Sequence, residues 1–476
     1  MIKKNDMGRS YLILGLLISA SFSLSFSRDV ILHGNAPSYA GCEIVFNRYT
    51  DWITKGEEEI GRCPVDTNGD FTVSLDLEQI TFVFSHLGIY KAFLYAEPGK
   101  SYGILLPERA DKDPEDELNP YFIESRIQLG TTDVSADDIN FMIRMFNDAY
   151  NPYYNKHIIS FINNDDFSEL NADIERLEKP FAGSENGFFN RYREYRYGLL
   201  RHLAYQQKSR SISEEYFRKK PVLFNNPAYM ELFTQVYDKY FVFFGMTDKG
   251  SRIYNDINAL KSYDDLKNTL LKDNVFYNDT IVELVILLNI YNEFYSDNFS
   301  RTGLLAILDT LISHTGIEQN RQIGETIKAK ITRLLSGYYP PAFELYDADS
   351  NIVSLDDLKG KYVYLNFCTS ISYTCLGEFE LLKGLYERYK EKLEIVTIDV
   401  EAHKTAFKDF QKNRNWNWKF LYYGNQPDIL KDYDIRAYPT YFLIGPDGKL
   451  IYSPSPSPAE NFESLLVKAM KERGDL

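Results

Sequence analysis

The spacing of hydrophobic residues divides the chain into three parts. From Val30 to about Leu106, short runs rich in β-branched and aromatic residues, such as Phe71-Thr-Val-Ser-Leu75, alternate with turn signals, such as Asn68-Gly69. An apolar period of two predicts strands with one buried face. We therefore expect residues 28–110 to form an antiparallel β-sandwich, followed by a charged, proline-containing linker at 111–117.

In the middle of the chain the period becomes that of a helix. Two apolar stripes recur at helical spacing: Phe188, Tyr192, Tyr195, Leu199 and Leu203, and then Tyr229, Leu232, Phe233, Val236, Tyr237 and Tyr240. Ser135-Ala-Asp-Asp138 resembles a capping box, and Asn226-Pro227 suits an N-cap followed by a proline at the first helical position. Residues 134–334 are predicted to be all-α. We interpret the aromatic stripes as core, with a groove for a partner as the alternative.

Strands and helices alternate in residues 336–476. The expected elements are a buried strand at Tyr362–Phe367, a helix at Phe379–Leu393, a strand at Glu394–Val400, helices at Thr405–Asn413 and near Asp428–Tyr433, a hairpin across Pro446-Asp-Gly448 and a final helix at Ala459–Arg473. This order predicts an α/β domain whose mixed sheet has helices on both faces. The whole chain is thus expected to be multidomain.

Residues 1–27 have the composition of a secretory signal peptide. A basic start that ends at Arg9 precedes an apolar run, Leu12–Phe22, and Ser25-Phe-Ser27 supplies the small residues that a signal peptidase reads. A membrane anchor is the alternative, but the run is short for a span. We expect export to the periplasm or cell envelope, with cleavage before Arg28 and no stable membrane span afterwards.

Charge and composition narrow the classes of partner. The net charge of −15 argues against nucleic acid, because no basic face is available to release counterions. The 37 Tyr and 32 Phe residues indicate wide amphipathic packing surfaces. The six histidines have no metal-ligand spacing, so neither a metal nor another cofactor is expected.

The candidate chemistry lies where the buried strand runs into a helix. There the chain reads Cys368-Thr-Ser-Ile-Ser-Tyr-Thr-Cys375, with Glu378 three residues further on. A thiolate at a helix N-terminus is stabilised by unpaired backbone N–H groups and by the helix dipole. Ser372 has the spacing from Cys375 that a redox pair would have, but a hydroxyl cannot form a mixed disulfide.

Three motifs in residues 336–476 resemble the TlpA/ResA-like branch of the thioredoxin family, which is related to the AhpC/TSA proteins. They are Gly360-Lys-Tyr-Val-Tyr-Leu-Asn-Phe367, Glu378 after Cys375, and Tyr438-Pro-Thr-Tyr-Phe-Leu-Ile-Gly-Pro-Asp-Gly448. The resemblance implies a thioredoxin-like fold and an exported thiol–disulfide protein. It is limited to this segment, and the regions before it resemble multidomain envelope proteins only loosely.

The resemblance also implies roles for residues. Ser372 occupies the position of the attacking cysteine, Cys375 that of the resolving cysteine, and Glu378 that of the acid that assists proton transfer. Cys368 replaces the family's tryptophan. Pro439 is expected to follow a cis bond, which would turn the backbone of Tyr438 toward the site and let it pair with a bound extended chain.

The sequence leaves three interpretations of Cys375 open. It is a buried remnant of an ancestral pair, or a single reactive cysteine of the peroxidase type with the Ser372 hydroxyl beside it, or one half of a disulfide with Cys368. Two functions follow. One is a module that binds protein or peptide partners, with at most vestigial redox chemistry. The other is an active oxidoreductase through Cys368 and Cys375, or a peroxidase through Cys375.

A second pair of cysteines lies in the N-terminal region. If the hairpin between Glu43 and Pro64 is symmetric about Trp52 and Ile53, Cys42 faces Cys63 across two antiparallel strands. Export makes oxidation plausible, so a Cys42–Cys63 disulfide is expected. A one-residue slip in register would turn the side chains to opposite faces.

Overall fold

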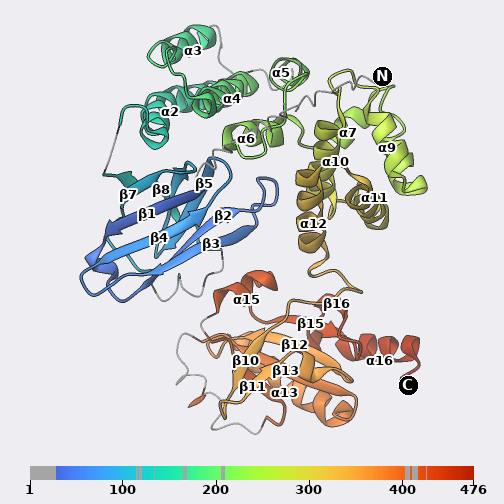
Figure 1. Ribbon diagram of the computed structural model, residues 1–476. Helices are drawn as coiled ribbons and strands as arrows, with labels where there is room; N and C mark the ends of the chain where they lie inside the picture. The colour runs from blue at the N-terminus through green and yellow to red at the C-terminus, as the bar shows by residue number, and fades with distance from the viewer. Residues whose placement is uncertain are drawn as a thin grey trace, which may run out of the picture.

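The computed structural model describes residues 28–476 apart from short internal stretches (114–115, 117–118, 120, 133–134, 164–168, 205–208, 402–407, 410–415 and 425). The expected signal peptide, residues 1–27, and most of the helix expected at 405–413 lie outside the described residues. Figure 1 shows a β region, a helical region and a C-terminal α/β region in chain order.

The β region consists of two sheets with the strand orders β4-β1-β7-β9 and β3-β2-β5-β6-β8. Its strands are β1 (Asp29–Asn35), β2 (Glu43–Tyr49), β3 (Glu57–Pro64), β4 (Asp70–Asp76), β5 (Thr81–Leu87), β6 (Tyr90–Ala96), β7 (Ser101–Leu105), β8 (Ser125–Gln128) and β9 (Gly130–Thr131). In β4 every apolar side chain is buried and every polar one is exposed, as a period of two requires. Residues of both sheets, among them Leu32, Phe46 and Leu75, form one core.

Two strand pairs differ from the expected antiparallel arrangement. Strand β1 pairs with β7, and β6 pairs with β8, in parallel. Parallel neighbours need a long crossover, and in both cases the connection between the paired strands is long enough to return the chain to the same end. The β region also continues beyond residue 110. After the charged linker, β8 adds an edge strand to the five-stranded sheet and β9 adds one to the four-stranded sheet.

Helices fill the middle of the chain. They are α2 (Ile139–Asn163), α3 (Leu170–Glu178), α4 (Gly187–Ala204), α5 (Ser209–Tyr216), α6 (Pro227–Val236), α7 (Tyr240–Gly245), α8 (Ile253–Asn255), a π-helical turn (Asp256–Leu260), α9 (Tyr263–Leu270), α10 (Asp279–Glu293), α11 (Arg301–His314) and α12 (Glu318–Thr332). Most residues of the two aromatic stripes are buried, and they include Tyr195 at 1% exposure and Tyr229 at 0%. The stripes therefore belong to the core, as predicted.

The starts of two helices test the capping predictions. Asn226 is the N-cap of α6, and its side chain accepts a hydrogen bond from the backbone N–H of Tyr229, as predicted. The box predicted at Ser135 is wrong, because α2 begins at Ile139. Asp138 caps this helix, since its Oδ1 accepts from the N–H groups of the second and third residues after it at 2.9 and 3.1 Å.

The helical region and the second sheet share a hydrophobic core. Phe82, Phe84 and Tyr95 of β5 and β6 are buried together with residues of the helices. Asn140 at the start of α2 strengthens this contact, because its side chain accepts from the N–H of Tyr95 and donates to its carbonyl oxygen. The two regions therefore form one continuous body, in which the helices cover one face of the second sheet.

The C-terminal region has a seven-stranded sheet in the order β11-β10-β14-β13-β12-β15-β16. Its strands are β10 (Glu344–Asp347), β11 (Ile352–Ser354), β12 (Tyr362–Cys368), β13 (Leu393–Asp399), β14 (Lys419–Tyr422), β15 (Thr440–Ile444) and β16 (Leu450–Ser455), and its helices are α13 (Tyr373–Tyr389), α15 (Pro427–Asp432) and α16 (Phe462–Arg473). The central strands β12, β13 and β14 are parallel, and the remaining pairs are antiparallel. This is the mixed sheet expected from the sequence.

Helix α13 begins six residues before the predicted start, at Tyr373, and ends at Tyr389. The early start follows from Ser372, which supplies an N-cap that the apolar periodicity from Phe379 onward did not reveal. Because of this start, Cys375 lies in the first turn of the helix, beside the end of β12.

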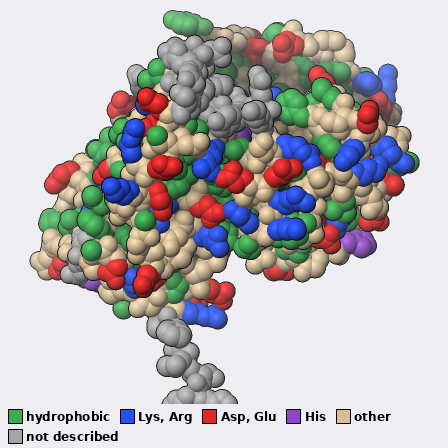
Figure 2. Space-filling model, turned by 90° about the horizontal axis from the view of Figure 1, so that it is seen from above, with side chains coloured by type: hydrophobic (Ala, Val, Ile, Leu, Met, Phe, Trp, Pro, Cys, Tyr) green, Lys and Arg blue, Asp and Glu red, His purple; other side chains and the backbone are tan. Residues whose placement is uncertain are grey.

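The described part of the C-terminal region contacts the rest of the chain through polar groups near α15. Arg333 after α12 forms an ion pair with Asp432 at 2.7 Å. The Tyr121 hydroxyl donates to Asp434, and the guanidinium of Arg436 lies over the Tyr121 ring at 5.4 Å from its centroid. Figure 2 shows acidic and basic side chains interspersed over the face that it presents, so the net negative charge is not concentrated there.

The role of Asp138 as the N-cap of α2 can be tested by substitution. Asp138→Ala is expected to lower the free energy of unfolding by about 1 kcal/mol, because two N–H groups at the start of α2 lose their acceptor. Urea denaturation followed by circular dichroism measures this loss. Ser135→Ala is the matched control and is expected to change little. A larger loss from the serine variant would mean that the helix begins at the predicted box.

Candidate active site

The candidate site lies at the junction of β12 and α13 (Figure 1). Strand β12 is buried along its whole length and ends at Cys368. The chain turns through the next three residues and enters α13 with Ser372 as its N-cap. The Ser372 Oγ accepts a hydrogen bond from the backbone N–H of Cys375 at 3.3 Å. Ser372 therefore has a structural role at the start of the helix.

The structure brings Cys368 and Cys375 together. Both residues are 0% exposed, and their side chains form a hydrogen bond to each other. Both are free cysteines in this structure. A Cys368–Cys375 disulfide stays a prediction, but the two thiols are neighbours, as it requires.

The two thiols differ in acidity. The hydrogen bond from Cys368 lowers the pKa of Cys375 to about 7, burial opposes this effect, and the Ser372 hydroxyl and a backbone hydrogen bond from Thr369 lower the pKa further. Burial raises the pKa of Cys368 well above its ordinary value. Because the thiolate is the nucleophilic form, Cys375 is the more reactive of the two sulfurs near neutral pH.

Glu378 lies one turn further along α13 and is buried. Its Oε2 accepts a hydrogen bond from the Tyr441 hydroxyl at 2.6 Å. Tyr441 belongs to β15, where it pairs with Asn366 of β12. The sequence singled out Glu378 but not Tyr441, because a tyrosine in an apolar strand gives no sign of the group that its hydroxyl will meet.

Asp399 is a second buried carboxylate, which the sequence interpretation missed. It ends β13 directly opposite Cys368 of β12 and is 0% exposed. Neither of its carboxylate oxygens has a hydrogen-bond partner among the residues that the structure describes. Burial, and then the negative charges of Glu401 and Cys375, raise the pKa of Asp399 to about 8. The signal that could have found it is an acidic residue ending an otherwise apolar strand beside β12.

The loop before β15 closes the other side of the site. The Tyr438–Pro439 bond is cis, as expected from the resemblance. Tyr438 is half-buried and lies near both cysteines. Burial is the main cause of its raised pKa, followed by electrostatic interaction with Tyr423 and then with Cys375 and Cys368. Residues predicted from separate motifs, at 368–378 and at 438–439, therefore meet at one place.

The predicted register of the first hairpin is wrong. Cys63 lies opposite Ile44 and not opposite Cys42. The pairs nearest the turn, such as Tyr49 with Glu57, are already one residue off the predicted register, and a bulge between Phe46 and Asn47 adds a second residue of offset. Both cysteines are free, and the Cys42 Sγ instead accepts from Nη1 of Arg109 at 3.1 Å.

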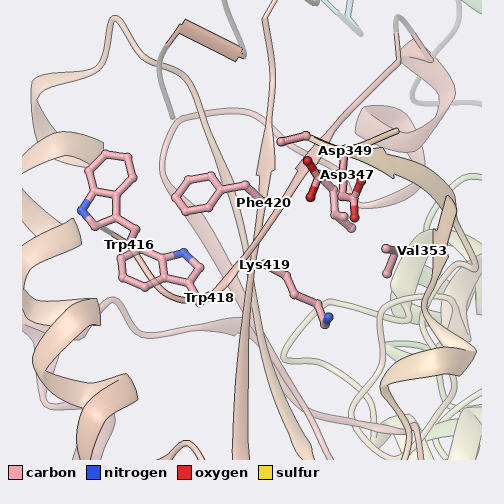
Figure 3. A pocket seen from close by; sticks show the side chains of 9 residues that line it. Asp347, Asp349, Val353, Trp416, Trp418, Lys419 and Phe420 are labelled. Carbon is pink, nitrogen blue, oxygen red and sulfur yellow. The ribbon is translucent and has the colours of Figure 1, made fainter. Parts of the chain in front are cut away.

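A pocket of about 320 Å³ opens at the N-terminal end of β14 (Figure 3). It is lined by Asp347, Ala348, Asp349, Val353, Trp416, Trp418, Lys419, Phe420 and Leu421. The Trp418 Nε1 donates to Thr397 Oγ1 at 3.0 Å, which fixes the indole against β13. Neither Cys368 nor Cys375 lines the pocket, so it is separate from the thiol site. Within the described part of the chain, no group of three or more His, Cys, Asp or Glu residues is arranged to hold a metal ion.

Comparisons with known proteins agree with this geometry. The family model described as AhpC/TSA matches residues 337–453, which include every residue of the thiol site. The thiol-disulfide oxidoreductase ResA of Bacillus subtilis (strain 168) is 32% identical over 154 residues, which cover 32% of this chain and 82% of that relative. Through its C-terminal domain, the chain belongs to the AhpC/TSA family.

Two further proteins match part of this chain. The thioredoxin-like protein YneN of the same Bacillus strain is 26% identical over 147 residues, 31% of this chain and 83% of the relative. A crystal structure of the thioredoxin domain of a thiol-disulfide oxidoreductase from Bacteroides vulgatus shares 24% identity, covers 28% of this chain and 96% of that one, and has a TM-score of 0.27. None of these matches covers more than 32% of this chain.

The buried carboxyl group leads to a prediction about stability. Asp399 ionises near pH 4 in an unfolded chain but only near pH 8 in the folded protein. The unfolded state therefore binds fewer protons between these values, and the free energy of unfolding must fall as pH rises from about 4 to about 8. Asp399→Asn removes the group whose ionisation causes this fall. It is expected to raise the free energy of unfolding at pH 8 by on the order of 3 kcal/mol, once the cost of a buried, unpaired amide is subtracted.

Urea denaturation of both proteins at pH 5 and pH 8 measures the difference. Glu391→Gln, which changes an exposed carboxylate just before β13, is the control and is expected to have little effect at either pH. An equal effect of Asp399→Asn at both pH values would mean that the carboxyl group ionises normally in the folded protein.

Proposed function

We propose that this chain is an exported, three-part protein whose C-terminal thioredoxin-like domain binds partner chains in the cell envelope and lacks ordinary disulfide reductase activity. The observation that carries this proposal is the position of Ser372. It caps α13 where a reductase would hold its attacking cysteine, and its hydroxyl is engaged with the N–H of Cys375. Without a thiol at this position, a mixed disulfide cannot form at the exposed end of the site.

The surface around Ser372 supports the binding of an extended protein or peptide. Ile371 and Tyr373, on either side of the serine, are 83% and 92% exposed, which is unusual for large apolar side chains. The cis bond before Pro439 lies in the loop that leads into β15. Backbone groups of such a loop can pair with an extended chain, while the two apolar side chains supply contact area.

Export to the periplasm or cell envelope is supported by the sequence of residues 1–27, which combines a basic start, an apolar run and small residues at the expected cleavage site. None of the helices in the described residues is sufficiently long and apolar to cross a membrane. In this proposal the β-sandwich (28–110) and the helical domain (134–334) precede the thioredoxin-like domain (336–476). The first two domains share one hydrophobic core and serve as a support for the third. Neither nucleic acid nor a cofactor takes part in the proposed function.

A second candidate function is favoured by the contact between the thiols. Cys368 and Cys375 are hydrogen-bonded, and the pKa of Cys375 is lowered to about 7 chiefly by that bond. This is the arrangement from which an internal disulfide forms, so the chain could work as a thiol–disulfide oxidoreductase through Cys368 and Cys375.

The Ser372 hydroxyl beside Cys375 also suits a peroxidase that uses Cys375 alone. Thiol trapping separates the oxidoreductase from the peroxidase. A reversible 368–375 disulfide supports the former, and sulfenic acid at Cys375 after peroxide supports the latter.

The leading proposal predicts a gain of activity from one substitution. Ser372→Cys places a thiol at the N-terminus of α13, where its pKa is expected to fall below the free value of about 8.5. Cys375 then stands one turn away as the resolving group. In an insulin-reduction assay with dithiothreitol, the unchanged protein is expected to show no acceleration, and the variant is expected to accelerate the reaction clearly.

Ser370→Cys is the matched control, because it adds a thiol two residues earlier in the turn, away from the start of the helix. It is expected to stay inactive. Turnover by the unchanged protein at the level of a Cys-x-x-Cys relative would contradict the proposal. A folded Ser372→Cys variant without activity would show that the turn no longer has redox geometry.

A further inference from the structure

Asp399 is placed beside the thiol that has to lose a proton if Cys368 and Cys375 form a disulfide. Asp399 and Cys368 are directly opposed residues of the parallel strands β13 and β12. Directly opposed residues of neighbouring strands point to the same face of a sheet. Cys368 contacts Cys375 of α13 on that face, so the carboxyl group of Asp399 lies between the sheet and the helix that carries the second thiol.

The other acidic groups near the thiols are already engaged. Glu378 on α13 accepts from the Tyr441 hydroxyl at 2.6 Å. Glu401, in the turn after β13, accepts from the Ser370 N–H at 2.6 Å and from the Thr369 hydroxyl at 3.2 Å. Asp399 differs from both, because its two oxygens are buried and without a partner among the described residues. A buried carboxyl group that makes no hydrogen bond lowers the stability of the fold, so its presence calls for another role.

We propose that Asp399 is the proton acceptor for Cys368, so that Cys375 attacks a disulfide and Cys368 resolves it. This inference rests on the second candidate function, the Cys368–Cys375 couple. It reverses the order that the resemblance implies, in which Cys375 is the resolving residue. It also moves proton transfer from Glu378 on the helix to Asp399 on the sheet.

The reaction balances with a disulfide as the only co-reactant. The Cys375 thiolate attacks one sulfur of the disulfide, a mixed disulfide forms, and the first thiolate leaves and takes a proton from water. Cys368 then gives its proton to the Asp399 carboxylate, and the Cys368 thiolate attacks the Cys375 sulfur. The internal disulfide forms, and the second leaving thiolate takes the proton from Asp399. Two protein thiols are oxidised, and one disulfide is reduced to two thiols.

The burial of the site indicates the class of substrate. Both cysteines are 0% exposed, at the end of β12 and in the first turn of α13. A disulfide can therefore reach Cys375 only when the residues packed around it move. A small disulfide, such as that of a tripeptide thiol, needs much less movement than a disulfide held within a folded protein, and it is the substrate class that we assign.

The charges around Asp399 set the direction of its pH dependence. Among the residues that the structure describes, the titratable groups that face it are Cys368 on β12, Cys375 on α13, Glu401 after β13 and Tyr422 on β14, and none of these four is a cation. Burial, Glu401 and Cys375 raise the pKa of Asp399 to about 8. Because only the ionised carboxylate accepts a proton, resolution by Cys368 is expected to accelerate as pH rises through about 8.

The full-length reduced protein is mixed with glutathione disulfide and quenched with acid, and mass spectrometry follows the mixed disulfide on Cys375 and the internal disulfide between about pH 6 and pH 10. Asp399→Asn is expected to form the mixed disulfide at the rate of the unchanged protein but to resolve it about 100-fold more slowly at pH 8. The mixed disulfide then accumulates, and the rise near pH 8 disappears. Glu394→Gln, a half-buried carboxylate on the same strand and away from the thiols, is the control and is expected to resolve normally.

Resolution by Asp399→Asn at the unchanged rate, with the unchanged pH profile, would overturn the inference, as would glutathione attached to Cys368 in place of Cys375. If circular dichroism shows that Asp399→Asn does not fold, Glu401→Gln gives a second reading. Removal of that charge is expected to shift the rise to lower pH, and an unmoved profile would contradict the proposal. If the unchanged protein forms neither disulfide, the second candidate function itself fails.

Discussion

The hydrogen bond between the buried thiols of Cys368 and Cys375 determines what the end of this sheet can do. It forms because β12 stays buried up to its last residue and because α13 begins at Tyr373, early enough to place a cysteine in its first turn. The bond lowers the pKa of one thiol and leaves the other protonated. A nucleophile and a proton donor thus lie side by side, without a cysteine at the exposed start of the helix.

The groups around this pair are arranged to support it. Ser372 completes the first turn of α13 and also hydrogen-bonds the Cys375 sulfur. Tyr441 holds Glu378, and Asp399 fills the position opposite Cys368 with a carboxyl group that finds no partner among the described residues. With Ser372 at the start of the helix, the site is therefore not an inert surface. It is a closed site with titratable groups inside, next to an exposed surface formed by Ile371 and Tyr373.

Much of this arrangement could be predicted from the sequence, for identifiable reasons. The apolar strand at 362–367 and the terminal hairpin follow from local patterns of several consecutive residues, and the cis bond before Pro439 is expected from the family resemblance of its motif. The register of the hairpin that carries Cys42 and Cys63 could not be predicted, because a one-residue shift at the turn and a bulge each change the register without changing the hydrophobic alternation.

Asp399 and Tyr441 were missed for a different reason. Each lies in a strand that reads as apolar, and each acquires its role only from the neighbouring strand or helix that the fold places beside it. The same holds for the two parallel strand pairs of the N-terminal sheets, which depend on where long connections return. Local patterns determine the elements, whereas contacts between distant segments determine the chemistry.

The most direct test of this account is a titration of the two cysteines by nuclear magnetic resonance, with the protein labelled with ¹³C at the cysteine Cβ atoms. The reduced protein is expected to show one thiol, assigned to Cys375 by its loss in Cys375→Ser, that ionises near pH 7. The Cys368 signal is expected to stay that of a protonated thiol well beyond this pH, and Cys368→Ala is expected to raise the pKa of Cys375. Ionisation of Cys375 at the ordinary pKa of a free thiol, unchanged in Cys368→Ala, would contradict the account.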